Sequence, residues 1–272
     1  MNETRVILTA GHGRSVPAEA LAELLRRDGI KVAGIIVVSM LNTRRFLALI
    51  RQRGLTAVMN TTVAALGWES RNFAPDKGHG PSKMTTFLTK HNIRTRGLKA
   101  WCDAYGAQYW RVDDLNACKT VAIVKRAAPH AVLYAGGGIL RRDFIAAAGR
   151  VLNAHAGPLP EIRGMNAAEW AALLDMPAEV TIHFIDTGID TGKPIRTFAY
   201  DRSTCKTTSE LRQAATIRGV EGMHEVVRAR AFEASTTSGP AAIPSRQCFI
   251  MAPALVQMLE RRLSLGTRSV DE

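Results

Sequence analysis

Three polar side chains have the types and the spacing that nucleophilic attack on a carbonyl carbon requires. Asn153 and His155 follow an apolar pair at 151–152, and Asp190 lies in a later turn. In a strand, Asn153 and His155 would point to the same face. The Asn153 amide could donate a hydrogen bond to an oxyanion, and the His155 imidazole could add a second donor or act as acid or base. A carboxylate beside the imidazole would raise its pKa, fix its orientation and accept a proton, and Asp190 is the candidate.

Two motifs in a fixed order carry a family resemblance. The run NAHAGPLPEIRG occupies 153–164, and TIHFIDTGIDTG occupies 181–192. This order of N-x-H, L-P-x-x-R-G and D-x-G-x-D-x-G resembles the catalytic core of the folate-dependent formyltransferases. That family acts on glycinamide ribonucleotide, methionyl-tRNA or sugar nucleotides, and formyltetrahydrofolate deformylase shares the core. The resemblance covers most of 108–200, includes 5–55 weakly, and implies that Asn153, His155 and Asp190 form a catalytic trio.

The resemblance also implies where a folate donor, 10-formyltetrahydrofolate, would bind. Its flat ring would lie against a glycine-rich segment and the turn of the later hairpin, because glycines let a ring approach the main chain closely. Gly137 and Gly138 stand where the family often has bulkier residues, so the shape of the site would differ; a simple flexible turn is the alternative. The expected folate-binding residues are Gly136, Gly137, Gly138, Ile139, Leu140, Ile185 and Gly188.

A second glycine turn is the candidate site for the other substrate. It precedes the first predicted helix, where free N–H groups and the helix dipole attract anions. It resembles the phosphate loop of glycinamide ribonucleotide formyltransferase, but it lacks the spacing of a dinucleotide fingerprint and is equally compatible with a structural turn. Arg163 is likewise compatible with orienting the acceptor or with a buried structural role. The expected acceptor-binding residues are Gly11, His12, Gly13, Arg14, Ser15 and Arg163.

Two further polar residues near the trio are expected to have structural roles. Asp186 has the position of a turn residue that hydrogen-bonds to its own backbone. His183 alternates out of phase with the chemistry and is expected to face a packed surface.

Composition limits the remaining possibilities. The 272 residues are 46% apolar and 22% charged, as in ordinary globular proteins, and the net charge of +12 favours anionic partners such as folate carboxylates, phosphates or RNA. The apolar runs are too short for a signal sequence or a membrane span, which predicts a cytoplasmic protein without a membrane partner. Four cysteines without C-x-x-C spacing indicate reduced thiols and no metal site.

Alternating strand and helix patterns predict an α/β fold, with a Rossmann-like, mostly parallel sheet and helices on both faces. Strands are expected at 5–10, 31–39, 108–112, 131–135 and from 151, followed by an antiparallel pair at 180–185 and 195–200. Helices are expected at 18–27, 42–53, 97–105, 116–127, 142–148, 166–174, 207–231 and 251–265, the one at 166–174 opening on a polar cap.

Residues 1–200 are predicted to form the catalytic domain, and 201–272 a small, mainly helical C-terminal extension. The pattern fades at about 66–96, which is predicted to be a surface insertion. Its basic residues would contact an acidic acceptor or be solvated: Lys77, Lys83, Lys90, Arg94 and Arg96.

The sequence therefore predicts an N-formyltransferase that uses 10-formyltetrahydrofolate and an anionic small-molecule amine, for example a phosphorylated compound or a sugar nucleotide. Hydrolysis, as in the deformylases, needs the same trio, but those enzymes carry a regulatory domain ahead of the first strand. Formylation of charged tRNA would suit the positive charge but is associated with a β-rich C-terminal domain, so nucleic acid is not expected. The intact trio disfavours a catalytically idle folate-binding scaffold. The acceptor's identity and the oligomeric state stay open, and a homodimer is compatible with the sequence.

Overall fold

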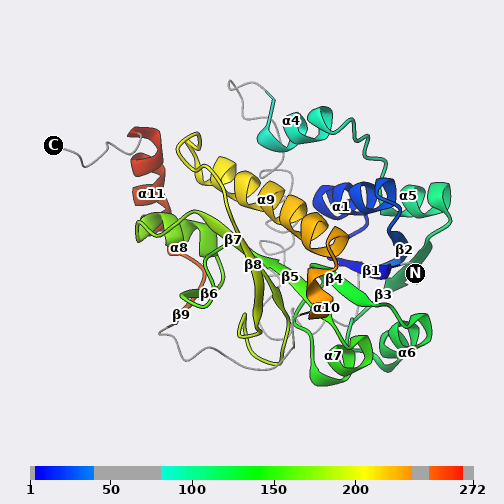
Figure 1. Ribbon diagram of the computed structural model, residues 1–272. Coiled ribbons are helices and arrows are strands. Elements are labelled where there is room, and N and C mark those ends of the chain that lie inside the picture. Colours follow the sequence, from blue (N-terminus) through cyan, green and yellow to red (C-terminus); the bar gives the residue numbers. More distant parts are fainter. Residues whose placement is uncertain (1–3, 40–80, 235–244, 266–272) are drawn as a thin grey trace, which may run out of the picture.

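The computed structural model describes residues 4–39, 81–234 and 245–265 (Figure 1). The predicted helix at 42–53, the first part of the predicted insertion and Lys77 lie outside these residues.

Seven of the described strands form one mixed sheet, and this confirms the predicted α/β architecture. Their order is β3 (Gln108–Val112), β2 (Lys31–Val38), β1 (Arg5–Ala10), β4 (Ala131–Ala135), β5 (Val151–His155), β7 (Glu179–Phe184) and β8 (Pro194–Ala199). The five strands from β3 to β5 are parallel, whereas β7 and β8 are antiparallel to their neighbours. The strand order reverses between β1 and β4. In open α/β sheets, ligands bind at the carboxyl ends of strands at such a switch point.

Helices cover both faces of this sheet (Figure 1). The larger apolar core lies under α1 (Val16–Arg27), α5 (Leu98–Tyr105) and α9 (Thr208–Arg228), and the smaller one under α6 (Cys118–Ala127) and α7 (Arg142–Ala148). Helix α9 packs on β5, β7 and β8, and a Cβ built at its Gly222 would lie 2.7 Å from the Phe198 ring. The long helix predicted after residue 200 therefore covers the sheet directly.

Part of the predicted insertion is a regular helix, so the expectation of an irregular surface segment is wrong there. Helix α4 (Lys83–Lys90) begins at Ser82, whose hydroxyl accepts a hydrogen bond from Thr85 N. Met84 and Phe87, one turn apart, are buried, and α4 packs against α9. The Lys83 ammonium donates to Thr204 Oγ1 at 3.0 Å, whereas the other described basic side chains of the segment are exposed: Lys90, Arg94 and Arg96.

A small unit that the sequence did not predict lies beside the sheet, where β6 (Ile162–Gly164) and β9 (Arg246–Cys248) form a parallel two-stranded sheet. Helices α8 (Ala167–Leu173) and α11 (Pro253–Leu265) lie next to it in Figure 1. Arg262 of α11 forms an ion pair with Asp175, just after the end of α8, and α10 (Ala231–Ala234) follows α9. In the described part of the chain, no helix combines the length and apolarity that crossing a membrane would need.

Candidate active site

Strand pairing brings the predicted trio and one further histidine together. In the antiparallel register of β5 and β7, Asn153 lies opposite His183 and His155 opposite Thr181. Residues directly opposite one another in such a pair share a face of the sheet. Asp190 reaches the same face from the hairpin that joins β7 to β8, where its φ is 50°. The convergence of Asn153, His155 and Asp190 that the sequence predicts is therefore present.

Both ring nitrogens of His155 point at oxygen acceptors. Nε2 lies 2.8 Å from the carbonyl oxygen of Ile162, and Nδ1 lies 3.3 Å from Asp190 Oδ2. Because a carbonyl oxygen can only accept, Nε2–H is the donor to Ile162. Burial lowers the pKa of His155, while the Asp190 charge and the Ile162 carbonyl act to raise it. Asp190 thus raises this pKa as expected, but the net shift is downward because desolvation of the ring outweighs the charge of Asp190.

Asp190 connects the β7–β8 hairpin to strand β6 through a hydrogen bond. Its Oδ2 accepts a hydrogen bond from Gly164 N at 2.9 Å, and its side chain is 18% exposed. A Cβ at Gly192 would lie 1.8 Å from the Phe184 carbonyl oxygen, so the tight hairpin that presents Asp190 requires glycine there. Asp186 accepts from Gly188 N at 2.9 Å, which confirms its predicted turn-forming role.

His183 belongs to the cluster, and its predicted placement out of phase with the trio is wrong. The ring is 1% exposed; Nδ1 lies 2.7 Å from Phe184 O, Nε2 lies 3.1 Å from Asn153 Nδ2, and Asp190 Oδ1 is 3.6 Å from Nε2. The Phe184 carbonyl fixes the proton on Nδ1, so Nε2 accepts from the Asn153 amide. Burial, and then repulsion from His155, lower the pKa of His183 to about 4, which keeps Nε2 an acceptor at neutral pH.

The glycine segment after β4 starts beside Asn153, because Tyr134 pairs with Asn153 across β4 and β5. Gly136, Gly137 and Gly138 have φ values of 111°, 124° and 100°, and a Cβ at Gly137 would lie 2.6 Å from Leu115 Cδ1. Burial raises the pKa of Tyr134, whose hydroxyl donates to Gly138 O at 2.9 Å.

The apolar members of the predicted folate site differ in exposure. Ile139 is 74% exposed, whereas Leu140 is 6% exposed and packs in the smaller apolar core. Ile185 is partly buried and Gly188 is exposed in the hairpin. Main-chain groups and Ile139 are thus the accessible part of this segment.

The turn from Gly11 to Ser15 follows β1 and lies against the glycine segment: a Cβ at Gly136 would be 3.3 Å from Gly11 N. Gly13 O accepts from Leu98 N at 2.9 Å, and His12 Nδ1 accepts from Arg14 N at 3.2 Å. Arg14 is exposed, whereas Ser15 is buried at the N-cap of α1 without a side-chain capping bond.

Arg163 lies on β6, next to Gly164, which holds Asp190. Its Nε is buried and hydrogen-bonds to none of the described residues. The glycine turn, the predicted folate segment and the trio thus lie at the carboxyl ends of β1, β4 and β5. Arg163 lies at the periphery of this group.

Comparison with known proteins identifies the fold. No protein-family model and no curated protein sequence matches the chain. Glycinamide ribonucleotide transformylase 1 from Symbiobacterium toebii is 18% identical with a TM-score of 0.56, over 88% of this chain and 92% of its own. A sugar N-formyltransferase from a Shewanella species is 10% identical with a TM-score of 0.55, over 96% and 88%. A 4-N formyltransferase from Francisella tularensis is 12% identical with a TM-score of 0.54, over 97% and 87%.

The chain has the formyltransferase fold. The resemblance that the two motifs indicated is thereby confirmed at the level of the fold.

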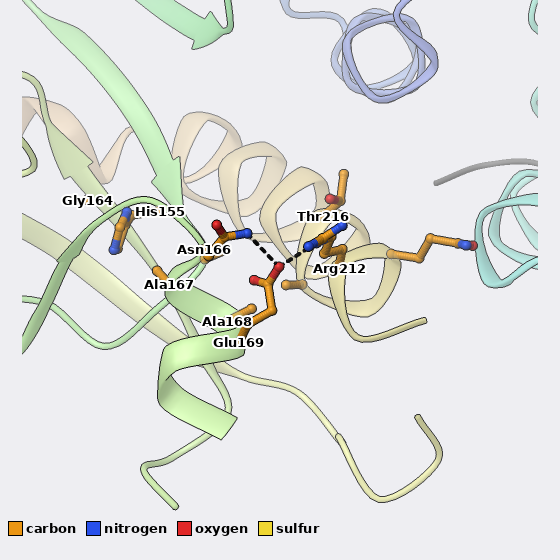
Figure 2. Close-up of a pocket in the computed structure, with 11 residues that line it drawn as sticks. His155, Gly164, Asn166, Ala167, Ala168, Glu169, Arg212 and Thr216 are labelled. Atoms are coloured by element: carbon orange, nitrogen blue, oxygen red, sulfur yellow. Dashed lines mark hydrogen bonds and ion pairs between the residues drawn. The ribbon is translucent and has the colours of Figure 1, made fainter. Parts of the chain in front are cut away.

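Within this formyltransferase fold, a cavity of about 210 Å³ lies beside His155, between α8 and α9 (Figure 2). Of the polar residues of its wall, Glu169, Arg212, Gln213 and Thr216 were not singled out from the sequence. Asn166 is the N-cap residue of α8, as predicted, but its backbone is left-handed and its side-chain amide donates to Glu169 rather than making a capping hydrogen bond. The cavity is lined by His155, Ala156, Gly164, Asn166, Ala167, Ala168, Glu169, Arg212, Gln213, Ala215 and Thr216.

In the described segments, no group of three or more His, Cys, Asp and Glu side chains is arranged to hold a metal ion. The four cysteines are free thiols.

Proposed function

We propose that this protein is an N-formyltransferase that moves a formyl group from 10-formyltetrahydrofolate to the amine of an anionic small-molecule acceptor. The observation that carries the proposal is the convergence of Asn153, His155 and Asp190 beside the switch point of a formyltransferase-fold sheet. An amide donor next to a buried imidazole–carboxylate pair is suited to transfer of an acyl group between nitrogens.

The glycine segment offers a fitting cradle for the folate ring. The positive φ values at Gly136, Gly137 and Gly138 expose main-chain groups, and a side chain at Gly137 would collide with Leu115. Ile139, which is largely exposed, would cover one side of a flat ring, with Ile185 and Gly188 at the opposite hairpin. When bound there, the folate supplies the formyl group.

Asn153 would stabilise negative charge on the formyl oxygen. One N–H of its Nδ2 is held by His183 Nε2, so the orientation of the amide is fixed and its second N–H is free to donate. A preorganised donor of this kind lowers the barrier without reorganising during the reaction.

The His155–Asp190 pair would receive the proton of the attacking amine. With Nε2–H donated to Ile162 O, the neutral imidazole presents an Nδ1 lone pair to the Asp190 carboxylate. Two acceptors 3.3 Å apart gain a hydrogen bond when one proton is added between them. The pair then returns that proton to the departing nitrogen of the donor, which balances the transfer. This geometry favours the acid–base role of His155 over that of a second oxyanion donor.

The anionic part of the acceptor would lie at Gly11 to Ser15, at the N-terminus of α1. Support comes from the position of this turn against the glycine segment, from exposed Arg14 and from the net charge of +12. Arg163 would assist from the margin of the site, because its buried Nε lacks a partner among the described residues.

The test is to incubate the protein with 10-formyltetrahydrofolate and a panel of amines, and to follow tetrahydrofolate release with and without each amine. We expect release that depends on one acceptor class and a formylated product detectable by mass spectrometry. The Asn153→Ala variant should release tetrahydrofolate about 10²–10³-fold more slowly, as expected for loss of one oxyanion donor.

Two outcomes would replace the proposal. Release that needs no acceptor would identify a hydrolase. Salt-sensitive binding of charged tRNA, with formylation of its amino acid, would identify a tRNA substrate. An Asn153→Ala variant with full turnover would remove the mechanism.

A further inference from the structure

The glycine-rich segment at 136–140 cannot keep one shape by itself. Its three glycines, 136–138, all have φ values in the left-handed region, and glycine loses more conformational freedom on folding than any other residue. The segment lies between β4, which ends at Ala135, and α7, which begins at Arg142. Contacts with neighbouring elements must therefore set its shape.

Side-chain donors from three parts of the chain hold carbonyl oxygens of this segment. One hydroxyl comes from β1 and one from β4, and an amide comes from the turn before α6. Because these donors belong to different elements, the segment is fixed both to the sheet and to the chain before α6. Each donor lies 2.9 Å from its acceptor: Thr9 Oγ1 from Gly136 O, Tyr134 Oη from Gly138 O, and Asn116 Nδ2 from Ile139 O.

Asn116 binds the main chain on both sides of Leu140. Its Nδ2 donates to Ile139 O, and its Oδ1 accepts from Arg141 N at 2.7 Å. A carboxamide carries both a donor and an acceptor, so it can take the place of a peptide group as the hydrogen-bonding partner of a main chain. Arg141 is the N-cap residue of α7. The Asn116 side chain thus joins the end of the segment to the start of this helix.

The Asn116 amide is itself held in one orientation. Asp114 Oδ1 accepts from Asn116 N at 3.0 Å and from Asn116 Nδ2 at 3.1 Å. The two N–H groups of Nδ2 therefore go to Asp114 and to Ile139, and a flipped amide would set its oxygen against two acceptors. Leu115 is fully buried, and a Cβ at Gly137 would lie 2.6 Å from its Cδ1. This turn is thus anchored in the core and contacts the segment at two points.

We propose that Asn116 is a positioning residue for the formyl donor, because it holds segment 136–140 in the shape that receives the folate ring. It acts through the main chain of Ile139, whose side chain is largely exposed and takes its direction from its backbone. A segment that is ordered before binding loses less entropy when the ring binds. Without Asn116 only a fraction of the molecules would hold this shape, and the apparent affinity would fall by that fraction. The inference rests on the proposed function for the identity of the ligand.

Calorimetric titration with tetrahydrofolate, under anaerobic conditions, tests the inference without turnover. Asn116→Ala removes both contacts with the segment and should weaken tetrahydrofolate binding about tenfold, because each lost hydrogen bond contributes on this scale. A second variant, Asn116→Asp, keeps the size of the side chain and an oxygen for Arg141 N. It has no N–H for Ile139 O, so it should weaken binding to a similar extent.

Two further measurements distinguish positioning from a general contribution to stability. At saturating 10-formyltetrahydrofolate, the kcat of Asn116→Ala and its KM for the amine should stay within about twofold of the wild type, while its KM for the donor rises about tenfold. Hydrogen exchange followed by NMR without folate should accelerate at the Arg141 amide, which donates to Asn116 Oδ1, and stay unchanged in β1 and β4.

The matched control is Arg27→Ala. Arg27 also holds two successive main-chain carbonyl oxygens of a loop, those of His91 and Asn92, at 2.6 and 2.8 Å. It lies on α1, which packs on the larger core, whereas Leu115 and Leu140 belong to the smaller one. Its loss should lower the free energy of unfolding and leave the tetrahydrofolate affinity unchanged.

The outcomes separate this inference from the proposed function. Formyl transfer with wild-type tetrahydrofolate affinity in both Asn116 variants would overturn the inference and leave the proposed function standing. Equal losses of affinity in Asn116→Ala and Arg27→Ala, or faster exchange throughout the sheet, would overturn it in favour of a purely structural role. Tetrahydrofolate binding that depends on Asn116, in a protein that formylates no amine, would uphold the inference and overturn the proposed reaction. A wild-type protein that binds no tetrahydrofolate would overturn both.

Discussion

Glu23 on α1 and Asp190 in the hairpin are both carboxylates surrounded by hydrogen-bonding groups, but only one of them is fully supplied with donors. Glu23 accepts from Arg26, Arg27 and the Trp101 indole, so every neighbour brings a proton. Asp190 accepts from Gly164 N but also faces His155 Nδ1 and His183 Nε2. The Nε2 atom of His183 accepts a hydrogen bond from the Asn153 amide, so it offers no proton to Asp190.

This difference separates a structural cluster from a chemical one. Around Glu23 the favourable state is already reached in the folded protein, which holds the pKa of Glu23 at about 2 through the Arg26 hydrogen bond, against the opposing effect of burial. Around Asp190 one more proton would complete a hydrogen bond. A site that gains from taking up a proton is suited to acid–base catalysis, whereas a satisfied one contributes stability.

The largest expected effect is on turnover, from Asp190→Asn. Asparagine tolerates the left-handed backbone at this position and preserves the shape of the side chain, but it cannot take up a proton. We expect kcat to fall about 10²–10⁴-fold, with the free energy of unfolding changed by less than about 1 kcal/mol. Stopped-flow measurement of tetrahydrofolate release tests the fall in kcat, and urea unfolding tests the free energy of unfolding. A variant that is active but unstable would reverse the assignment of the two clusters.

Glu23→Gln should give the opposite result. Losing a carboxylate that pairs with two arginines should cost about 1–3 kcal/mol of stability at pH 7, while turnover per folded molecule stays at the wild-type level. Because the folded-state pKa is depressed, the wild-type advantage is complete above pH 4.5 and disappears as pH falls from 4.5 towards 2. Urea unfolding of both proteins at several pH values between 7 and 3 measures it. A constant difference across that range would contradict the ion-pair explanation.

His183→Gln sharpens the comparison, because it should change stability and turnover together. The depressed pKa of His183, about 4 rather than 6.5, means that the unfolded chain binds a proton that the folded protein does not. Wild-type stability should therefore fall by about 1–3 kcal/mol as pH drops from 6.5 to 4, and the variant should lack this component. Its kcat should also fall about tenfold with KM within about twofold, because the Asn153 amide loses its orienting acceptor.

The control is His224→Gln, which removes the 2.9 Å contact with Asp28, away from the trio, and should leave kcat unchanged. An unaltered pH profile in His183→Gln would show that His183 does not titrate as its burial indicates.

The sequence predicted the elements whose signal is local. The strand at Gln108–Val112 and the helix at Arg142–Ala148 have the predicted bounds, because alternation and helical periodicity depend on neighbouring residues. Helix α4 was missed because its burial depends on α9, far along the chain. Strands β6 and β9 have three residues each, and their pairing joins segments that no local pattern connects.

The residues of the site also divide into those that a local sequence signal predicts and those that depend on contacts between distant segments. Asn153, His155 and Asp190 were found because two motifs specify them, whereas His183 was judged by its alternation within β7 alone. Its face is set by the register with β5, and that register places His183 opposite Asn153. The Glu169–Arg212 pair joins α8 to α9 and likewise exists only after the helices have packed.

Gly164 links β9 to the catalytic trio, because it pairs with Cys248 of β9 and also hydrogen-bonds to Asp190. Its N–H holds Asp190 Oδ2, while a Cβ on it would lie 2.2 Å from the Cys248 carbonyl oxygen. The backbone that positions the Asp190 carboxylate thus packs against β9, a strand that lies far along the chain from Gly164. A Gly164→Ala substitution would disturb this contact and misalign the Asp190 carboxylate without changing the identity of any residue of the trio.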